Sequence, residues 1–409
     1  MARNVILMRH GESAANARGV WQGTGSSPLT AKGLRQARRA GERLAGRRLA
    51  LVESSDLERC VDTARAVGFE PRRRPIWREG DVGEWEGLDR RCVMAHFGEE
   101  LERLHYDYDM PVGVTGESPR QAGERGWQGV HDVVGRLDEG QTALVVTHAG
   151  LIGALLRLVL GLPSDRRRLG VVSNTSFCEL SFGTDGAVMR RFNDAAHLAP
   201  VPAWPEQMRL AGGVVVELIR HGASYANAAR GGRRGRDSLH PRGRAQTERL
   251  RDGIGEIDEV YSSPLGRAMD TAGILGGRPP VEVPGLGEVD LTGWNGDEWP
   301  EVEAAHLGDG DLKDGAGAGQ PHGGETWSEV QRRVSPFLES LVRNHSHRRV
   351  AVVSHGGVIR ACAGSVLDFG FEKARLLASL DNASVTQVVM GASGNAVLAT
   401  YNITAHLEN

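Results

Sequence analysis

The chain has 409 residues, 40% of them hydrophobic, a length that predicts two or three domains with ordinary apolar cores. Its formal net charge of -3 argues against nucleic acid or a membrane surface as a partner. The basic residues are almost all arginine, since Lys32, Lys313 and Lys373 are the only lysines among 49. Arginine carries a planar fork of donors that suits the oxygens of phosphate.

Four cysteines are scattered along the chain without a C-x-x-C pair: Cys60, Cys92, Cys178 and Cys362. This spacing predicts neither a metal site nor a disulfide framework, and it indicates a reducing compartment. Only a four-residue apolar run precedes Arg9, which is too short for a signal peptide, and no stretch approaches the roughly 18 apolar residues of a membrane span. We therefore expect a soluble, cytoplasmic protein.

The first predicted element is a buried strand at 5–8, which ends in Arg9-His10-Gly11. A buried strand with this ending places a cation and an imidazole at the mouth of a sheet, where they can bind and attack a phosphate. The same arrangement returns at 214–219, followed by Arg220-His221-Gly222. A feature of this kind that occurs twice predicts a duplicated domain.

Helical patterns follow the strands in both halves of the chain. Residues 33–49 have helical spacing after Thr30, a candidate N-cap. Residues 144–146 predict another buried strand with a helix from 151, and 350–353 with 358 onward repeat this order. The fold class is therefore α/β, as two tandem three-layer α/β/α domains, each a mostly parallel sheet flanked by helices. Both histidine motifs then follow the carboxyl ends of strands, where open α/β sheets bind ligands.

The repeat extends through five blocks in the same order. These are Arg9–Asn16 with Arg220–Asn227, 29–36 with 239–246, 54–59 with 262–267, 145–150 with 352–357, and 193–198 with 402–407. The offset between the copies is 211 residues at His10 and 207 residues at His148. A period this long indicates a domain duplication, because solenoid periods are roughly 20–50 residues. The proline-rich stretch 199–205 predicts the join, and we expect domains at 1–207 and 208–409.

These motifs together resemble the histidine phosphatase superfamily, whose fold is phosphoglycerate mutase-like. The resemblance covers nearly the whole chain as two consecutive domains. Its specificity comes from the duplicated order: Arg-His-Gly, then Ser-Ser-x-Leu-x-Arg, then a glutamate, then a histidine after a strand. It implies a phosphatase that needs no metal and no other cofactor, because arginine and histidine supply the positive charge.

The resemblance implies that His10 and His221 are the nucleophiles. A neutral imidazole attacks phosphorus in line and carries the phosphoryl group as phosphohistidine. Its other nitrogen must be held, for instance by a backbone carbonyl, so that the attacking lone pair is aimed.

The general acids implied by the resemblance are Glu79 and Glu288. They would protonate the leaving oxygen and later deprotonate water, a role that requires a raised pKa. Asp81 and Asp290 also repeat and are the alternative acids.

A repeated set of side chains would hold the phosphoryl oxygens. Phosphoryl transfer depends mostly on positioning and charge stabilisation, and arginine forks make short bidentate contacts to phosphate. The set is Arg9, Asn16, Arg59 and His148 in the first copy and Arg220, Asn227, Arg267 and His355 in the second. A helix cap is the alternative role of the two asparagines.

The copies differ inside the motifs at three positions. These are Glu12 against Ala223, Thr30 against His240, and Asp56 against Pro264. None of the three is a residue that the resemblance assigns to chemistry, so we predict that both copies are catalytically competent. The variable stretches 90–125 and 297–325 are predicted to face the substrate.

The leading hypothesis is a phosphomonoesterase of the histidine acid phosphatase type that acts on a small phosphorylated metabolite, such as a sugar phosphate or nucleotide. One alternative is a cofactor-dependent phosphoglycerate-type mutase, although the 69 residues from Glu79 to His148 resemble the spacing of the compact phosphatase branch. The other is a single catalytic copy with a regulatory or phosphate-binding second copy. The duplication makes the chain a pseudo-dimer, and a homodimer of the chain stays open.

Overall fold

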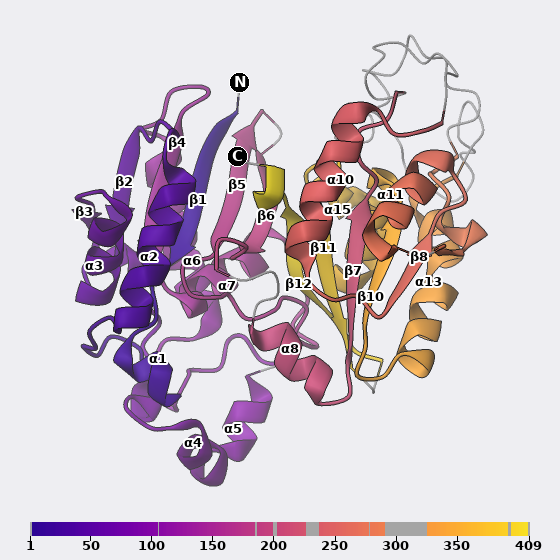
Figure 1. Cartoon of the computed structure of the whole chain (residues 1–409). Helices are drawn as coiled ribbons and strands as arrows, with labels where there is room; N and C mark the ends of the chain where they lie inside the picture. The colour runs from indigo at the N-terminus through magenta and orange to yellow at the C-terminus, as the bar shows by residue number, and fades with distance from the viewer. Residues whose placement is uncertain are drawn as a thin grey trace. The chain divides into compact units, whose positions relative to one another are not determined.

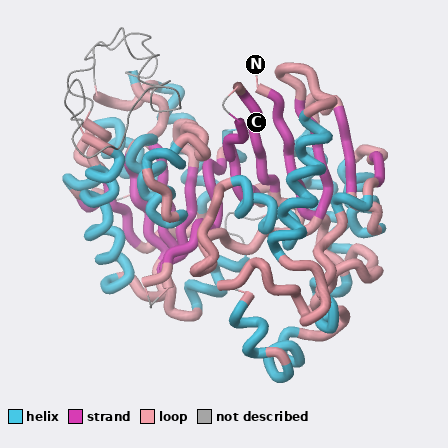
Figure 2. The backbone as a smooth tube through the Cα atoms, turned by 180° about the vertical axis from the view of Figure 1, so that it is seen from behind, coloured by secondary structure: helices cyan, strands magenta, loops and turns pink. Residues whose placement is uncertain are grey.

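The computed structural model describes residues 2–104, 106–184, 186–198, 203–225, 237–277, 279–290, 325–391 and 394–407. Its contacts divide the chain into two compact units, Met1–Ala199 and Pro200–Asn409. Each unit has a central sheet between layers of helices, which confirms the predicted fold class (Figures 1 and 2). Residue 207, the predicted domain boundary, lies inside helix α8 (Ala203–Leu210), and that boundary stays a prediction.

In the first unit the strand order is β3-β2-β4-β1-β5-β6. The first four of these strands are parallel, whereas β5 is antiparallel to β1 and to β6. The elements in chain order are β1 (Arg3–Arg9), α1 (Ala14–Arg18), α2 (Ala31–Leu44), β2 (Leu51–Ser54), α3 (Glu58–Val67), β3 (Arg72–Arg73), η1 (Pro75–Trp77), η2 (Gly83–Trp85), α4 (Arg90–His96), α5 (Gly98–Arg103), α6 (Pro119–Val134), β4 (Thr142–Thr147), α7 (Ala149–Val159), β5 (Phe177–Gly183) and β6 (Gly186–Asp194).

The second unit repeats this topology, with the strand order β9-β8-β10-β7-β11-β12 and only β11 reversed. After α8 its described elements are β7 (Val214–Arg220), α10 (Pro241–Ile254), β8 (Glu259–Ser262), α11 (Gly266–Gly276), β9 (Val281–Glu282), η3 (Pro284–Leu286), α13 (Trp327–Asn344), β10 (Arg349–Ser354), α14 (Gly356–Leu367), α15 (Phe371–Ala374), β11 (Val385–Met390), β12 (Ala396–Ile403) and η5 (Ala405–Leu407). No helix among the described residues is long and apolar enough to cross a membrane.

The central strands are apolar on both faces, as expected for strands covered by helices on each side. Residues Val5 to Met8 of β1 are at most 1% exposed. Ile6 and Met8 pack against Ala37 and Ala40 of α2 and against α3, whereas α6 and α7 contact β1 and each other. In the second unit α10 and α11 cover one face, and α14 packs against β7 and α13.

Helix α2 begins where the sequence predicts and ends earlier. The Thr30 side chain accepts a hydrogen bond from Gly33 N at 3.0 Å, which confirms the predicted N-cap. The predicted end at residue 49 is wrong, because the helix stops at Leu44, just before Gly46 with a φ of 85°. The backbone of the nucleophile loop packs closely against this helix. A Cβ on Gly11 would lie 2.5 Å from Gly33 O, so the position requires glycine.

Candidate active site

Both predicted nucleophiles directly follow a central strand, and each ring is held in one orientation. Nδ1 of His10 lies 2.7 Å from Gly11 O, and Nδ1 of His221 lies 2.7 Å from Gly222 O. Because a carbonyl oxygen only accepts, Nδ1 carries the proton and Nε2 keeps its lone pair. The two side chains are buried. Each copy therefore holds an imidazole whose unprotonated nitrogen is Nε2.

The second histidine of each copy lies beside the first. The ring centroids of His10 and His148 are 5.1 Å apart in an edge-on arrangement, and those of His221 and His355 are also 5.1 Å apart. The pairing follows from the topology, because β1 and β4 are adjacent parallel strands that end in register, with Arg9 opposite Thr147. Strands β7 and β10 end together in the same way.

Arg59 lies between the second histidine of the first site and the loop that contains Gly23 and Gly25. Its Nε donates to Nδ1 of His148 at 3.3 Å, and its two Nη atoms donate to the carbonyl oxygens of Gly25 and Gly23 at 2.8 and 2.7 Å. Glu86 accepts from Gly23 N at 2.9 Å and so supports the loop on which Arg59 rests. The guanidinium is therefore fixed beside the histidine pair.

Arg9 and Asn16 complete the first clamp. Arg9 donates to Val172 O at 2.7 Å and to Asn16 Oδ1 at 3.3 Å. Its Nε is buried and has no hydrogen-bond partner among the described residues. Asn16 also closes a capping box with Ser13 at the start of α1, so it is a cap and a neighbour of Arg9 at once.

No carboxylate in the described residues forms an ion pair with Arg9 or Arg59. Burial lowers the pKa of Arg9 to about 10, and burial also lowers the pKa of Arg59. Buried cations without a direct ion pair are unfavourable, and the nearby charge of Glu79 offsets this effect only in part. An anion placed between these two side chains would therefore be stabilised strongly.

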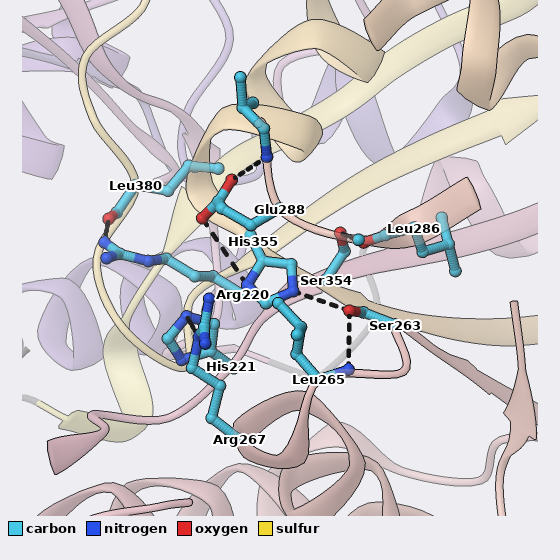
Figure 3. Close-up of polar contacts among 12 residues, drawn as sticks. Arg220, His221, Ser263, Leu265, Arg267, Leu286, Glu288, Ser354, His355 and Leu380 are labelled. Carbon is cyan, nitrogen blue, oxygen red and sulfur yellow. Dashed lines mark hydrogen bonds and ion pairs between the residues drawn. The ribbon is translucent and has the colours of Figure 1, made fainter. Parts of the chain in front are cut away.

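In the second copy, shown in Figure 3, Arg267 has other partners than Arg59, whereas Arg220 keeps the kind of backbone contact that Arg9 makes. Nε of Arg267 donates to Nε2 of His221 at 3.2 Å, and its Nη1 forms an ion pair with Asp237. Arg220 donates to Leu380 O. A phosphoryl group that approaches His221 would have to take over contacts that Arg267 makes here with Asp237 and with the nucleophile itself.

His355 lies between Glu288 and Ser263 (Figure 3). Its Nε2 is 2.8 Å from Ser263 Oγ, and its Nδ1 is 3.7 Å from Glu288 Oε2. In the first copy, Nε2 of His148 instead lies 3.3 Å from Cys60 Sγ. The second histidine is thus held by a different partner in each copy.

All four histidines are kept neutral by their surroundings. Burial, followed by the charge of Arg9, holds the pKa of His10 well below its usual value, and burial does the same for His148. Burial lowers the pKa of His221 to about 3 and that of His355 to about 2. A neutral imidazole is the form that attacks phosphorus.

The Glu79 carboxylate lies at the N-terminus of α7, the helix that His148 precedes. Its Oε2 accepts from Gly150 N at 3.0 Å, and its Oε1 accepts from Leu151 N at 2.9 Å and from Gly80 N at 3.1 Å. A Cβ on Gly150 would lie 2.6 Å from Oε1, so this glycine leaves room for the carboxylate. The helix terminus also favours a negative charge here, which is the charge of the carboxylate after it has given a proton to the leaving oxygen.

Glu288 makes fewer hydrogen bonds than its counterpart. It is half-buried, accepts from Val289 N at 3.0 Å and faces Nδ1 of His355. Burial raises its pKa, as a general acid requires. The alternative acid Asp81 is exposed and accepts from Gly83 N at 2.9 Å, so the geometry favours the glutamates.

The pH profile of the second copy follows from these shifts and can be measured in a His10→Ala chain. Since the pKa of His221 is about 3, kcat/KM should show no acid-side loss near pH 6.5, the ordinary histidine value. Since the pKa of Glu288 is raised above 4.5, the acid stays protonated to higher pH, and kcat/KM should fall as pH rises through that raised pKa. Glu288→Gln should remove this decrease of kcat/KM with rising pH. An acid-side loss centred near pH 6.5, after correction for substrate ionisation, would contradict the assignment.

In each copy an arginine binds the backbone just before the general acid, Glu79 or Glu288. Nε and Nη2 of Arg125 donate to the two oxygens of Glu117 at 2.9 and 2.6 Å, and Nη1 donates to the carbonyl oxygens of Ile76 and Arg78. The second copy repeats these bonds with Arg333, Glu325, Gly285 and Gly287. Since Arg78 directly precedes Glu79, Arg125 is a positioning residue that the sequence analysis missed.

Arg125→Met should lower kcat of the first copy roughly tenfold, with little change in KM, because the acid loses its alignment while the arginine clamp is retained. The measurement uses a His221→Ala chain, in which only the first copy turns over. Arg333→Met in the same chain is the matched control, and it should leave this activity unchanged. A rise in KM at constant kcat would contradict a role through Glu79.

Two further side chains hold the backbone of each nucleophile. Asn174 Nδ2 donates to His10 O at 3.0 Å, and Thr63 Oγ1 accepts from Gly11 N at 3.0 Å. The equivalent bonds join Asn382 to His221 and Thr271 to Gly222. An extension of the internal alignment beyond the five blocks would have found both pairs.

Parts of the predicted site fall outside the described residues. Asn227 is one, and most of the predicted substrate-facing stretch 297–325 is another. The first stretch, 90–125, contains α4 and α5. Within the described ranges no group of three or more His, Cys, Asp or Glu side chains could hold a metal ion, and the four cysteines are free.

Residues 5–195 and 216–404 each match the family model of the histidine phosphatase superfamily (branch 1). The adenosylcobalamin/alpha-ribazole phosphatase of Escherichia coli (strain K12) is 32% identical over 39% of this chain and 80% of its own length. The glucosyl-3-phosphoglycerate phosphatase of Mycolicibacterium vanbaalenii is 34% identical over 44% of this chain and 84% of its own. The probable phosphoglycerate mutase GpmB of Enterobacter sp. (strain 638) is 34% identical over 50% and 99%. The solved structure of a mycobacterial glucosyl-3-phosphoglycerate phosphatase aligns with a TM-score of 0.42 at 30% identity, over 46% of this chain and 97% of that one.

Proposed function

The chain belongs to the histidine phosphatase superfamily, and from this premise we propose that both copies are metal-independent phosphomonoesterases of the histidine acid phosphatase type. Each would act on a small phosphorylated metabolite, a sugar phosphate or nucleotide, through a phosphohistidine. The observation that carries the proposal is the pair of neutral histidines that follow two adjacent parallel strands in both copies, with an arginine hydrogen-bonded to one histidine of each pair.

In the first step the phosphoryl group binds between Arg9 and Arg59, facing Nε2 of His10. Nε2 forms a bond to phosphorus while the bond from phosphorus to the leaving oxygen breaks. Glu79, protonated at this stage, gives its proton to that oxygen, and the alcohol departs. The hydrogen bond from Nδ1 to Gly11 O stabilises the positive charge that develops on the ring.

In the second step Glu79 takes a proton from water, and the water oxygen attacks phosphorus. The bond between phosphorus and Nε2 breaks, inorganic phosphate leaves, and His10 is neutral again with Glu79 protonated. His221, Glu288, Arg220 and Arg267 would take the same roles in the second copy.

Two alternatives are kept as outcomes of the test. A phosphoglycerate-type mutase is supported by the names of several relatives, which divide between phosphatases and phosphoglycerate mutases. A single catalytic copy is supported by the contact of Asp237 with Arg267, since a carboxylate on the clamp opposes binding of a phosphate.

The experiment is a screen of phosphorylated metabolites for release of inorganic phosphate, in the presence of a chelator. Wild type, His10→Ala and His221→Ala are compared on each substrate. Phosphate release that resists the chelator and survives in both single variants supports two phosphatase copies. Transfer of labelled phosphate to a second metabolite faster than its release to water supports the mutase, and loss confined to one variant on every substrate supports a single catalytic copy.

A cytoplasmic location and a homodimer of this chain remain predictions. Cell fractionation tests the first. Light scattering, which gives the molar mass in solution, tests the second.

A further inference from the structure

The positions at which the two copies differ lead to a second site beside the nucleophile loop. In the first copy, Glu12 accepts from Thr30 Oγ1 at 2.9 Å and from Lys32 Nζ at 2.7 Å. Its carboxylate neutralises the lysine at the start of α2. The first copy therefore carries its own anion at this place.

The second copy keeps the donors and loses the carboxylate. Ala223, His240 and Arg242 stand at the positions of Glu12, Thr30 and Lys32. Nδ1 of His240 accepts from Arg242 N at 3.2 Å, so Nε2 carries the ring proton and is a donor. Among the described residues no carboxylate forms an ion pair with the guanidinium of Arg242 or with that of Arg249, two turns further along α10.

These side chains line a cavity of about 780 Å³ within the second unit. Its wall includes Ala223, His240, Arg242, Arg249 and Asp381. Asp381 is the acidic member, and its Oδ2 accepts from the amide of Asn402 at 3.0 Å. A volume in this range suits a small molecule. The remaining charge of the lining is positive.

We propose that this cavity binds the carboxylate or phosphate group of a small anion, which takes the place of the missing Glu12 carboxylate. Arg242 and Nε2 of His240 donate to it, as Lys32 and Thr30 donate to Glu12. Arg249 adds a second positive charge. The residues of this site lie outside the proposed catalytic set. Anion binding can therefore be confirmed or refuted independently of the phosphatase function.

The occupied cavity would contact the groups that hold the second nucleophile. Gln246 Oε1 accepts from Ala223 N at 3.0 Å, and Asn382 Nδ2 donates to His221 O at 3.2 Å. Both side chains line the cavity. The anion is therefore either a second anionic group of the substrate of this copy or a separate ligand that acts on its loop.

Binding is tested with malonate as the probe, by calorimetric titration of the full chain. Ala223→Glu restores the built-in carboxylate, and it should weaken malonate binding roughly tenfold or more, as should Arg242→Ala. Lys32→Ala is the matched control, because that cation is already neutralised, and it should bind as wild type does. Equal affinity in wild type, Ala223→Glu and Arg242→Ala would overturn the proposal. Arg249→Ala serves where Ala223→Glu fails to fold, with the same expected weakening.

Kinetics of a His10→Ala chain separate the two sources of the anion. Competitive inhibition by malonate that is lost in Ala223→Glu supports a subsite for the substrate's own second anionic group. A noncompetitive effect that is lost in the same variant supports a separate ligand. Identical inhibition with and without Ala223→Glu overturns the site.

Discussion

Replacement of both His10 and His221 by alanine is expected to lower phosphate release from every substrate by about 10⁴-fold or more, because no nucleophile remains. Either single replacement should remove only the activity of its own copy. The reason is structural: each histidine has its own carbonyl partner, its own second histidine and its own arginines within one unit.

The control for these variants is His131→Ala. This histidine is exposed and packs edge-on against Trp127, outside both sites, so its loss should leave activity unchanged. Full activity in the double variant would contradict phosphohistidine catalysis altogether. Thermal unfolding of all four chains checks that the losses do not come from misfolding.

Replacement of Arg59 by alanine is expected to lower kcat/KM of the first copy by about 10²–10³-fold, since the charge beside the reacting phosphoryl group is lost. Arg59→Lys should recover little of this activity. A single ammonium cannot reach both the carbonyl oxygens of Gly23 and Gly25 and the ring of His148 while it also binds phosphate. The measurement is kcat/KM in a His221→Ala chain.

Arg267→Ala in the same chain is the matched control for this loss. Its guanidinium belongs to the second copy, so the activity of the first copy should be unchanged. An Arg59→Ala chain that keeps kcat/KM within threefold of its parent would contradict the assignment of Arg59 to the phosphate clamp.

The sequence predicts the fold and the convergence of the histidines well, and for a physical reason. A parallel sheet brings the carboxyl ends of adjacent strands together, so residues that follow two such strands must meet. His10 and His148 are 138 residues apart in the chain, and their rings lie side by side with centroids 5.1 Å apart, as strand register requires. The duplication supplied a second instance of each motif, which excluded chance similarity.

What the sequence could not predict is which distant side chains bind backbone atoms of the site. Arg125 and Asn174 act on the carbonyl oxygens of residues 76, 78 and 10, and a carbonyl oxygen has no residue type by which a pattern could identify it. Only repetition between the copies marks these side chains. The different partners of Arg59 and Arg267 also depend on three-dimensional placement, since the flanking motifs are nearly the same.

The motif positions at which the copies differ change the surroundings of the two sites, which the sequence analysis did not predict. Asp56 forms a bidentate ion pair with Arg78, directly before Glu79, where the second copy has Pro264 and Gly287. Glu12 supplies a carboxylate beside the nucleophile loop of the first copy, whereas Ala223 supplies none in the second. The two copies therefore share one chemical core within different surroundings, and we expect them to differ in substrate before they differ in mechanism.

The most direct test of the account is the number of phosphohistidines formed per chain. Rapid alkaline quench of the enzyme with labelled substrate preserves phosphohistidine, and later acid treatment releases label from phosphohistidine but not from phosphoserine. With substrates for both copies at saturation, wild type should bind label at His10 and at His221, each single alanine variant at one site, and the double variant at none. Label that persists in the double variant, or that never reaches either histidine in wild type, would contradict the mechanism proposed for both copies.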